Sequence, residues 1–135
     1  MSISIEKARK GLDAGIQKAS QLNSPSSICI LDDGRNLVAF ARMDGALLAS
    51  IDLSKAKAFT ARSMNMNTGD LSALVQPGAP LYGLEAAHNP SFVVFGGGVP
   101  IKLGDTVVGA VGVAGGMVPD DEAIAAAVAA AIAQA

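Results

Sequence analysis

Apolar positions along this chain follow two periods, one typical of helices and one typical of strands. In the N-terminal segment they recur on one helical stripe, which predicts a helix that begins after Ser4 and ends at residues 23–25. The stripe consists of Ile5, Ala8, Leu12, Ile16 and Ala19. In the stretch SSICILDDGRNLVAFARM, residues 26–43, two β-rich runs flank Asp33-Gly34. Because Asp-Gly suits the positive φ of tight turns, this stretch predicts a β-hairpin.

The rest of the chain predicts three more helices and two more strands. Residues 47–64 contain no proline and carry apolar residues around the helix, so we expect a helix buried on most sides. Thr68 is the expected N-cap of a short helix over 69–76, and Asp120 that of the last helix. One strand is expected over 91–95 and through the glycines to 99–103, and another over 106–113. The order helix, strand, strand, helix, helix, strand, strand, helix predicts a single α+β domain over residues 1–135, with an antiparallel sheet of about four or five strands flanked by helices.

Composition narrows the class of protein further. Half of the 135 residues are apolar and only 16% are charged, which is more apolar surface than a small domain needs for its own core, so we expect a homo-oligomer. The net charge of −2 offers no basic field for nucleic acid or an anionic membrane, and no apolar run is long enough to span one. The N-terminal residues lack the apolar core of a signal sequence, and a single cysteine, Cys29, excludes an intrachain disulfide. We therefore expect a cytoplasmic protein with a buried, inert thiol.

Glycines are concentrated between residues 96 and 116. The segment GAVGVAGG, residues 109–116, lacks the spacing and the parallel βαβ context of a dinucleotide-binding fingerprint. Gly109 and Gly112 are better explained as positions where a helix or another subunit approaches a strand closely. For the earlier glycines an alternative is a small-molecule pocket, because missing side chains leave room for a ligand. The wall of that pocket would consist of Gly96, Gly97, Gly98 and Pro100.

Polar residues after the second strand and on the middle helix are candidates for ligand binding or catalysis. In the motif RMDG, Arg42 and Asp44 are two residues apart, so both point the same way if the strand continues. Arg42 is expected to bind a carboxylate or a haem propionate while Asp44, next to Gly45, orients it; the alternative is a structural ion pair. Lys55 is a candidate acid–base or Schiff-base group if it is partly buried, and otherwise a lysine at the rim of the helix.

His88 is the only histidine of the chain. In EAAH it follows Glu85 by three residues, which on a helical turn would direct both side chains toward one metal ion. A single histidine can also be an axial ligand of haem iron. The alternative is a histidine that anchors a surface loop. The sequence contains no C-x-x-C-H for covalent haem attachment and no G-x-S-x-G of a serine hydrolase.

Four segments together resemble the GlcG/HbpS family, which includes haem-binding proteins and the C-terminal domain of PduO-type proteins. In the same order, over nearly the whole chain, they are LVAFARMDGALLASIDLSKAKAFTA, PGAPLYGL, GGGVPIK and GDTVVGAVGVAGG. The resemblance implies a profilin-like or PAS-like fold, a compact homo-oligomer that is often an octamer, and in some members haem or iron binding. It also implies that a residue of the middle helix such as Thr60 approaches bound haem, whereas its chemistry alone favours a bond to its own helix backbone.

Three hypotheses for function stay open at this point. The first is a haem- or tetrapyrrole-binding oligomer without enzymatic activity, although four Phe, one Tyr and no Trp leave few rings to stack on haem. The second is a lyase, isomerase or hydratase acting on a small organic acid or hydroxy compound, with Asp44 or Lys55 as the acid–base group and Arg42 as the substrate anchor. The third is an accessory scaffold oligomer of a catabolic pathway.

Overall fold

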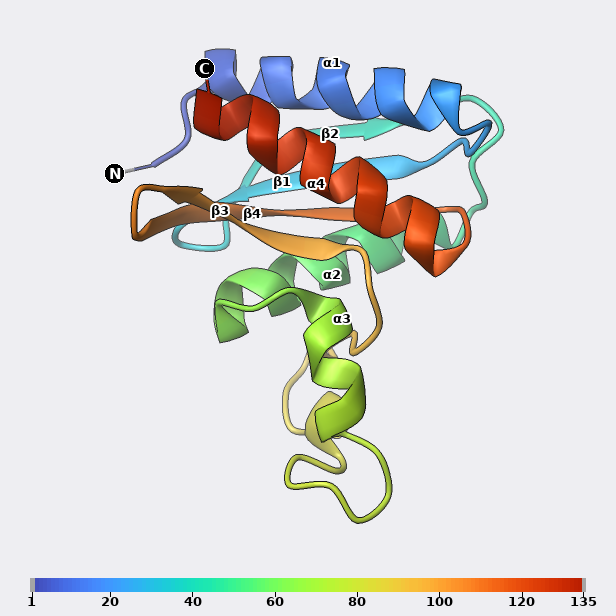
Figure 1. Cartoon of the computed structure of the whole chain (residues 1–135), viewed down its shortest axis with the longest axis vertical. Helices are drawn as coiled ribbons and strands as arrows, with labels where there is room; N and C mark the ends of the chain where they lie inside the picture. The colour runs from blue at the N-terminus through green and yellow to red at the C-terminus, as the bar shows by residue number, and fades with distance from the viewer. Residues whose placement is uncertain (1, 135) are drawn as a thin grey trace.

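The computed structural model describes residues 2–134 and places a four-stranded antiparallel sheet between two layers of helices (Figure 1). The sheet has the strand order β2-β1-β4-β3. In chain order the elements are α1 (Ile5–Gln21), β1 (Ser27–Asp32), β2 (Leu37–Arg42), α2 (Ser50–Met64), α3 (Thr68–Leu71), the 3-10 turns Ser72–Leu74 and Leu84–Ala86, β3 (Gly98–Leu103), β4 (Thr106–Ala114) and α4 (Val118–Gln134). This arrangement confirms the predicted α+β class and the predicted order of elements.

The sheet separates two apolar layers. Helices α1 and α4 pack together on one face, and α2 packs on the other (Figure 1). Because successive side chains of a strand point to opposite faces, β1 contributes to both layers. Ile28 and Ile30 belong to the core beneath α1 and α4, whereas Cys29 and Leu31 cluster with Ala58 of α2.

Small residues allow α1 to approach α4 closely. Ser4 caps α1 as predicted, because its hydroxyl accepts a hydrogen bond from the Lys7 N–H at 3.2 Å. A Cβ at Gly11 would come within 2.7 Å of Ile132, so only glycine fits there without a shift. Ile5 of the predicted stripe is instead 59% exposed. The fully buried positions of the helix are Ala8, Gly11, Gly15 and Ala19.

The β1–β2 hairpin turns where the sequence predicts it. The Asp32 carboxylate accepts hydrogen bonds from the N–H groups of Gly34 at 2.9 Å and Asn36 at 2.8 Å. The residue with positive φ is Arg35, at +66°, and not the glycine of the Asp-Gly pair. The prediction of a turn is thus confirmed. The residue in the left-handed conformation, however, is the one that follows the Asp33-Gly34 dipeptide.

Helix α2 lies directly on β4 because Gly112 has no side chain. A Cβ there would collide with the Ser54 carbonyl oxygen and the Ala58 amide nitrogen, which confirms the predicted close approach of a helix to this strand. The helix begins at Ser50 rather than at residue 47, and Leu48 before it is 77% exposed. Its buried residues are mostly small or polar, and only Asp52 and Lys55 of the helix are exposed in the single chain; its burial against a neighbouring subunit stays a prediction.

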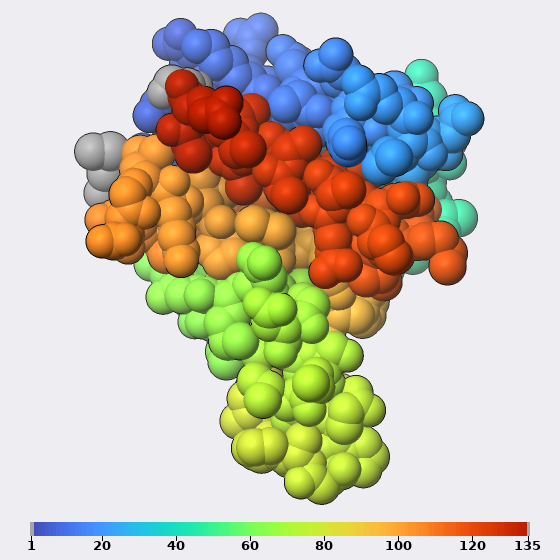
Figure 2. Space-filling model, viewed as in Figure 1, coloured from blue at the N-terminus to red at the C-terminus, as the bar shows by residue number. Residues whose placement is uncertain are grey.

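Residues 65–97, here called the arm, leave the rest of the molecule after α2, project away from it and return to β3 (Figures 1 and 2). Two threonine hydroxyls hold its base: Thr60 Oγ1 accepts a hydrogen bond from the Val93 N–H, and Thr68 Oγ1 accepts one from the Gly98 N–H, both at 2.9 Å. Thr68 therefore lies inside α3 instead of capping it. The expected helix over 69–76 is reduced to α3 and one 3-10 turn, and residues 91–95 form an irregular segment in place of the predicted strand.

The C-terminal helix differs from its prediction only at its start. It begins at Val118, which places Asp120 in the first turn and not at the cap. The neighbouring Asp121 accepts a hydrogen bond from the Gly116 N–H at 3.1 Å, so this second aspartate holds the chain where it enters the helix. Among residues 2–134 no helix, α4 included, has the length and apolarity needed to cross a membrane.

Candidate ligand-binding cavity

A cavity of about 680 Å³ lies beside α2 and reaches the sheet, because Cys29 and Leu31 of β1 line it together with residues of α2. Three segments far apart in the sequence wall it: the β1–β2 hairpin, α2 and the returning part of the arm. Its lining is mostly apolar, and both its volume and its composition are typical of sites for small organic ligands. The larger apolar side chains are Leu31 and Leu37 of the hairpin, Leu53 and Phe59 of α2, and Val93 of the arm.

The thiol of Cys29 forms part of the wall contributed by β1. Burial raises the pKa of this thiol to about 12, and the positive charge of Lys55 only partly opposes that effect. Since the thiolate is the reactive form, Cys29 is a poor nucleophile at neutral pH. The structure thus confirms the predicted buried thiol and adds that it lines a cavity.

Three charged side chains line the cavity: Arg35, Asp52 and Lys55. The Arg35 guanidinium lies 4.6 Å from the centroid of the Phe59 ring and donates a hydrogen bond to Ser63 Oγ at 3.2 Å. The Lys55 Nζ lies 5.4 Å from the centroid of the Phe40 ring. All three charged residues are exposed, so each can reach a ligand without crossing the apolar wall.

His88 packs beside the cavity on an aromatic cluster. Its ring centroid lies 5.3 Å from that of Phe59, a cavity residue, and 5.5 Å from that of Phe92. Its Nδ1 lies 3.3 Å from the Pro90 carbonyl oxygen. No group of three or more His, Cys, Asp or Glu side chains within residues 2–134 is placed to hold a metal ion, so Glu85 and His88 gain no third ligand of these kinds from this chain.

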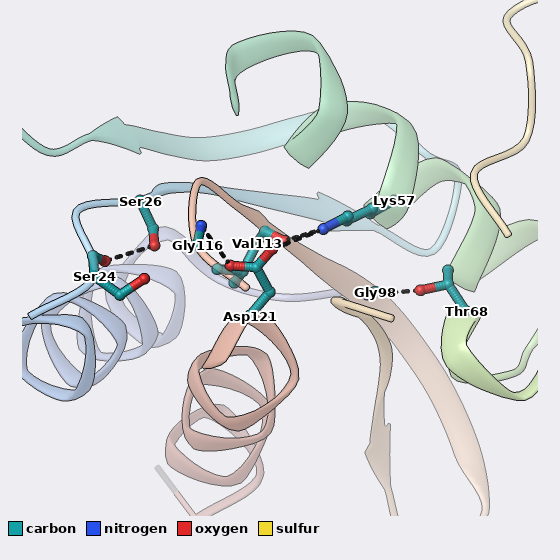
Figure 3. A network of polar contacts seen from close by, with 8 residues as sticks. All are labelled: Ser24, Ser26, Lys57, Thr68, Gly98, Val113, Gly116 and Asp121. Atoms are coloured by element: carbon teal, nitrogen blue, oxygen red, sulfur yellow. Dashed lines mark hydrogen bonds and ion pairs between the residues drawn. The ribbon is translucent and has the colours of Figure 1, made fainter. Parts of the chain in front are cut away.

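A second polar cluster lies on the opposite side of α2, buried against the sheet (Figure 3). The Lys57 ammonium group is 1% exposed and donates hydrogen bonds to the Val113 carbonyl oxygen at 2.8 Å and to Asp121 Oδ2 at 3.0 Å. Asp121 in turn accepts a hydrogen bond from the Gly116 N–H. This cluster joins α2, the end of β4 and the start of α4, and the cavity lies on the other side of the helix.

The ionisable groups of this cluster are both perturbed by burial. Desolvation lowers the pKa of Lys57, against the opposing effect of Asp121, and raises the pKa of Asp121, against the opposing effect of Lys57. The sequence offers Lys55 as the candidate for a partly buried lysine, but the helix buries Lys57. The signal for this was the stripe of small residues Ser50, Ser54, Ala58 and Ala61, since Lys57 lies on the same helical face.

The RMDG motif lies outside the cavity. Arg42 ends β2, and Asp44 and Gly45 lie in the exposed turn that follows, with Gly45 at a φ of +83°. Within residues 2–134 the only ion pair is the one between Lys57 and Asp121, so Arg42 and Asp44 do not pair with each other in this chain. Of the residues assigned to the enzyme hypothesis, only Lys55 lines the cavity.

The glycine segment before β3 packs against Lys57 and not against the cavity. A Cβ at Gly97 would come within 2.7 Å of the Lys57 Nζ, and one at Gly98 within 2.6 Å of a Thr68 methyl group. At Gly96 it would overlap the Glu122 side chain. Thr60 donates a hydrogen bond to the Ala56 carbonyl oxygen at 2.7 Å while it holds Val93 of the arm, and Pro100 faces a separate shallow hollow beside Lys102.

Comparison with known proteins finds relatives of this chain whose names mention haem. The family model described as "Haem degrading protein HbpS-like" matches residues 3–130. An uncharacterised 15.0 kDa protein from the dhaT-dhaS intergenic region of Citrobacter freundii is 40% identical over 92% of this chain and 87% of its own length. The corrinoid adenosyltransferase PduO of the same organism is 38% identical over 93% of this chain, which spans only 37% of that longer protein. The crystal structure of the PduOC:haem complex has a TM-score of 0.93 and 37% identity, covering 97% of this chain and 95% of that one.

Proposed function

This chain belongs to the HbpS-like family of haem-degrading proteins, and from that premise we propose that it binds haem, or a closely related tetrapyrrole, in the cavity between α2, the β1–β2 hairpin and the arm. The observation that carries the proposal is an apolar cavity of about 680 Å³ with cationic side chains among its lining. A flat apolar macrocycle with ionised substituents needs both features in one site. The likeness to a protein that has been solved as a haem complex supports the same ligand class.

The residues present fit such a ligand. Leu31, Leu53 and Phe59 supply apolar contact for the macrocycle, and Phe59 is one of the few aromatic rings of the chain. The His88 ring lies tilted beside that of Phe59, and its imidazole is the group that would hold the iron. Bound haem supplies a redox-active iron, while the protein's part is to bind the macrocycle, orient it and exclude water from one of its faces.

We also propose that the protein assembles into a homo-oligomer, with an octamer as the expected form. Large apolar side chains are exposed at several places on the single chain, including Leu47, Leu48, Tyr82 and Met117. Exposed apolar surface of this kind is typical of contacts between subunits. Native mass spectrometry of the purified protein measures the subunit number directly, and a monomer at micromolar concentration would contradict this part of the proposal.

The decisive experiment titrates haem into the protein, with a visible spectrum and native mass spectrometry on the same samples. We expect stoichiometric uptake and a sharp Soret band. Ala56→Trp fills the cavity from α2 and should abolish uptake, while Ala126→Trp, on the exposed side of α4, is the matched control and should bind as the wild type does. Absence of stoichiometric uptake by the wild type, or equal uptake by both tryptophan variants, overturns the proposal.

His88→Ala tests the iron ligand separately from binding. If His88 holds the iron, this variant should still take up the macrocycle through the apolar wall, but with a shifted or broadened Soret band. An unchanged spectrum assigns the axial ligand to another group and leaves the cavity proposal in place.

A further inference from the structure

We infer that the cavity selects tetrapyrroles by the free carboxylates on one edge of the macrocycle, which Arg35 and Lys55 bind. This inference rests on the proposed function and deepens it, because it assigns the orientation and the charge class of the ligand. The lining of the cavity has two parts, an apolar wall and a charged rim formed by Arg35, Asp52 and Lys55. Among residues 2–134, Arg35 and Lys55 are the cationic side chains that line the cavity, and both are exposed.

The two cations come from different elements and line the same cavity. Arg35 lies over the Phe59 ring from the hairpin, and the Lys55 Nζ reaches from α2 over the Phe40 ring of β2. Two carboxylates carried on adjacent positions of a flat ligand can each meet one of them.

Backbone conformation places Arg35 where it is. Its φ of +66° is the left-handed position of the hairpin turn. The Asp32 carboxylate and the bond from the Arg35 N–H to the Asp32 carbonyl oxygen at 3.1 Å hold this turn. From this position the Arg35 side chain reaches the Phe59 ring at the cavity.

The remaining charged side chain that lines the cavity is Asp52. Asp52 lies three residues before Lys55 on α2, and within residues 2–134 it forms no ion pair with either cation. Residues three apart on a helix are neighbours, so its carboxylate lies beside Lys55 and offsets part of that lysine's attraction for anions, whereas Arg35 reaches the cavity from the hairpin. The ligand that fits this lining has a large apolar surface and carboxylates that reach Arg35 and Lys55, as haem has.

The test compares haem with its dimethyl ester, which keeps the iron and the ring but carries no carboxylate. We expect the wild-type protein to bind haem at least about tenfold more tightly than the ester, as charge-assisted hydrogen bonds imply. Arg35→Gln and Lys55→Met should each weaken haem binding by about three- to tenfold and leave ester binding unchanged. Added salt should weaken binding of haem more than binding of the ester.

Matched control variants distinguish the effect of the two cations at the cavity from the effect of removing any exposed positive charge. Arg42→Gln and Lys102→Met remove exposed cations that do not line the cavity, and both should bind the two ligands as the wild type does. Equal affinity for haem and ester, with no effect of the rim variants, overturns the inference while the proposed function stands. Failure of both ligands to bind the wild type overturns the proposed function and the inference with it.

Discussion

Two lysines on α2, two residues apart, occupy opposite environments. Lys57 is 1% exposed and forms a buried ion pair with Asp121 on the sheet side of the helix. Lys55 is exposed at the rim of the cavity and lies over the Phe40 ring. The rotation of about 200° between positions two residues apart in a helix accounts for the difference. One face of α2 thus joins the parts of the fold, and the other is free to meet a ligand.

Removing each lysine in turn is the strongest test of this comparison. Lys57→Ala leaves the Asp121 carboxylate buried without its partner, and we expect the free energy of unfolding to fall by about 3–5 kcal/mol. Lys55→Ala changes only an exposed side chain and should stay within about 0.5 kcal/mol of the wild type. Urea unfolding followed by circular dichroism measures both values.

The double variant Lys57→Met/Asp121→Asn is the control for this test. It removes both charges, while the asparagine can still accept the Gly116 hydrogen bond, so it should recover much of the stability that Lys57→Ala loses. If Lys57→Ala and Lys55→Ala have equal effects, the two faces of the helix do not differ as described.

Larger side chains placed against the two faces of α2 should give the next largest difference in stability. Gly112→Ala places a methyl group against the Ser54 carbonyl oxygen, and we expect a loss of about 1–3 kcal/mol in the free energy of unfolding. Ala56→Trp extends into the cavity and should leave the thermal midpoint nearly unchanged while it blocks the ligand. Thermal unfolding of the two variants measures both effects on stability. A Gly112→Ala variant as stable as the wild type would contradict the close contact of α2 with β4.

The buried pair should also give stability a pH dependence that Lys55 does not. The raised pKa of Asp121 means that its contribution to the unfolding free energy is greatest below its ordinary 3.8 and falls as pH rises through the raised value. The lowered pKa of Lys57 means that its contribution is greatest above its ordinary 10.5 and falls as pH drops through the lowered value. Relative to Lys57→Met/Asp121→Asn, the wild type should therefore be least stable at intermediate pH. Unfolding curves of both proteins across the pH range check this, and a constant difference would contradict it.

The smallest expected effect is on the cavity thiol. The charge of Lys55 opposes the rise in the pKa of Cys29, so Lys55→Met should raise that pKa further and slow alkylation of the thiol by about twofold. Lys102→Met should leave the rate unchanged. Mass spectrometry of the folded protein during reaction with iodoacetamide at alkaline pH measures the rates, and faster alkylation of Lys55→Met would reverse the sign predicted here.

Much of the fold could be predicted because its signals are local. The helical stripe after Ser4, the turn at residues 33–36 and the glycine at position 112 each act within a few residues or at one strand position, and the structure confirms them. The predictions were wrong where contacts with distant parts of the chain outweigh the local preference for a helix or a strand. Residues 91–95 have the composition of a strand, but Val93 bonds to the Thr60 hydroxyl instead of a neighbouring strand.

The candidate site was less predictable for the same reason. Lys55 and His88 were singled out, and the structure places Lys55 in the cavity and His88 beside it. Arg35 was not singled out, because its role depends on a left-handed turn that lays it over Phe59 of another element. Lys57 was missed because its burial depends on which face of α2 meets the sheet.

The sequence by itself determined the order of elements, the hairpin and the close approach of helix and strand at Gly112, since periodicity, turn residues and side-chain size are properties of short segments. Only the tertiary structure decided which lysine is buried and where a cavity forms. That cavity joins residues 29–37, 52–59 and 90–93. Segments so far apart in sequence meet only when the sheet, α2 and the base of the arm have packed, because the contacts that bring them together are made by the fold as a whole.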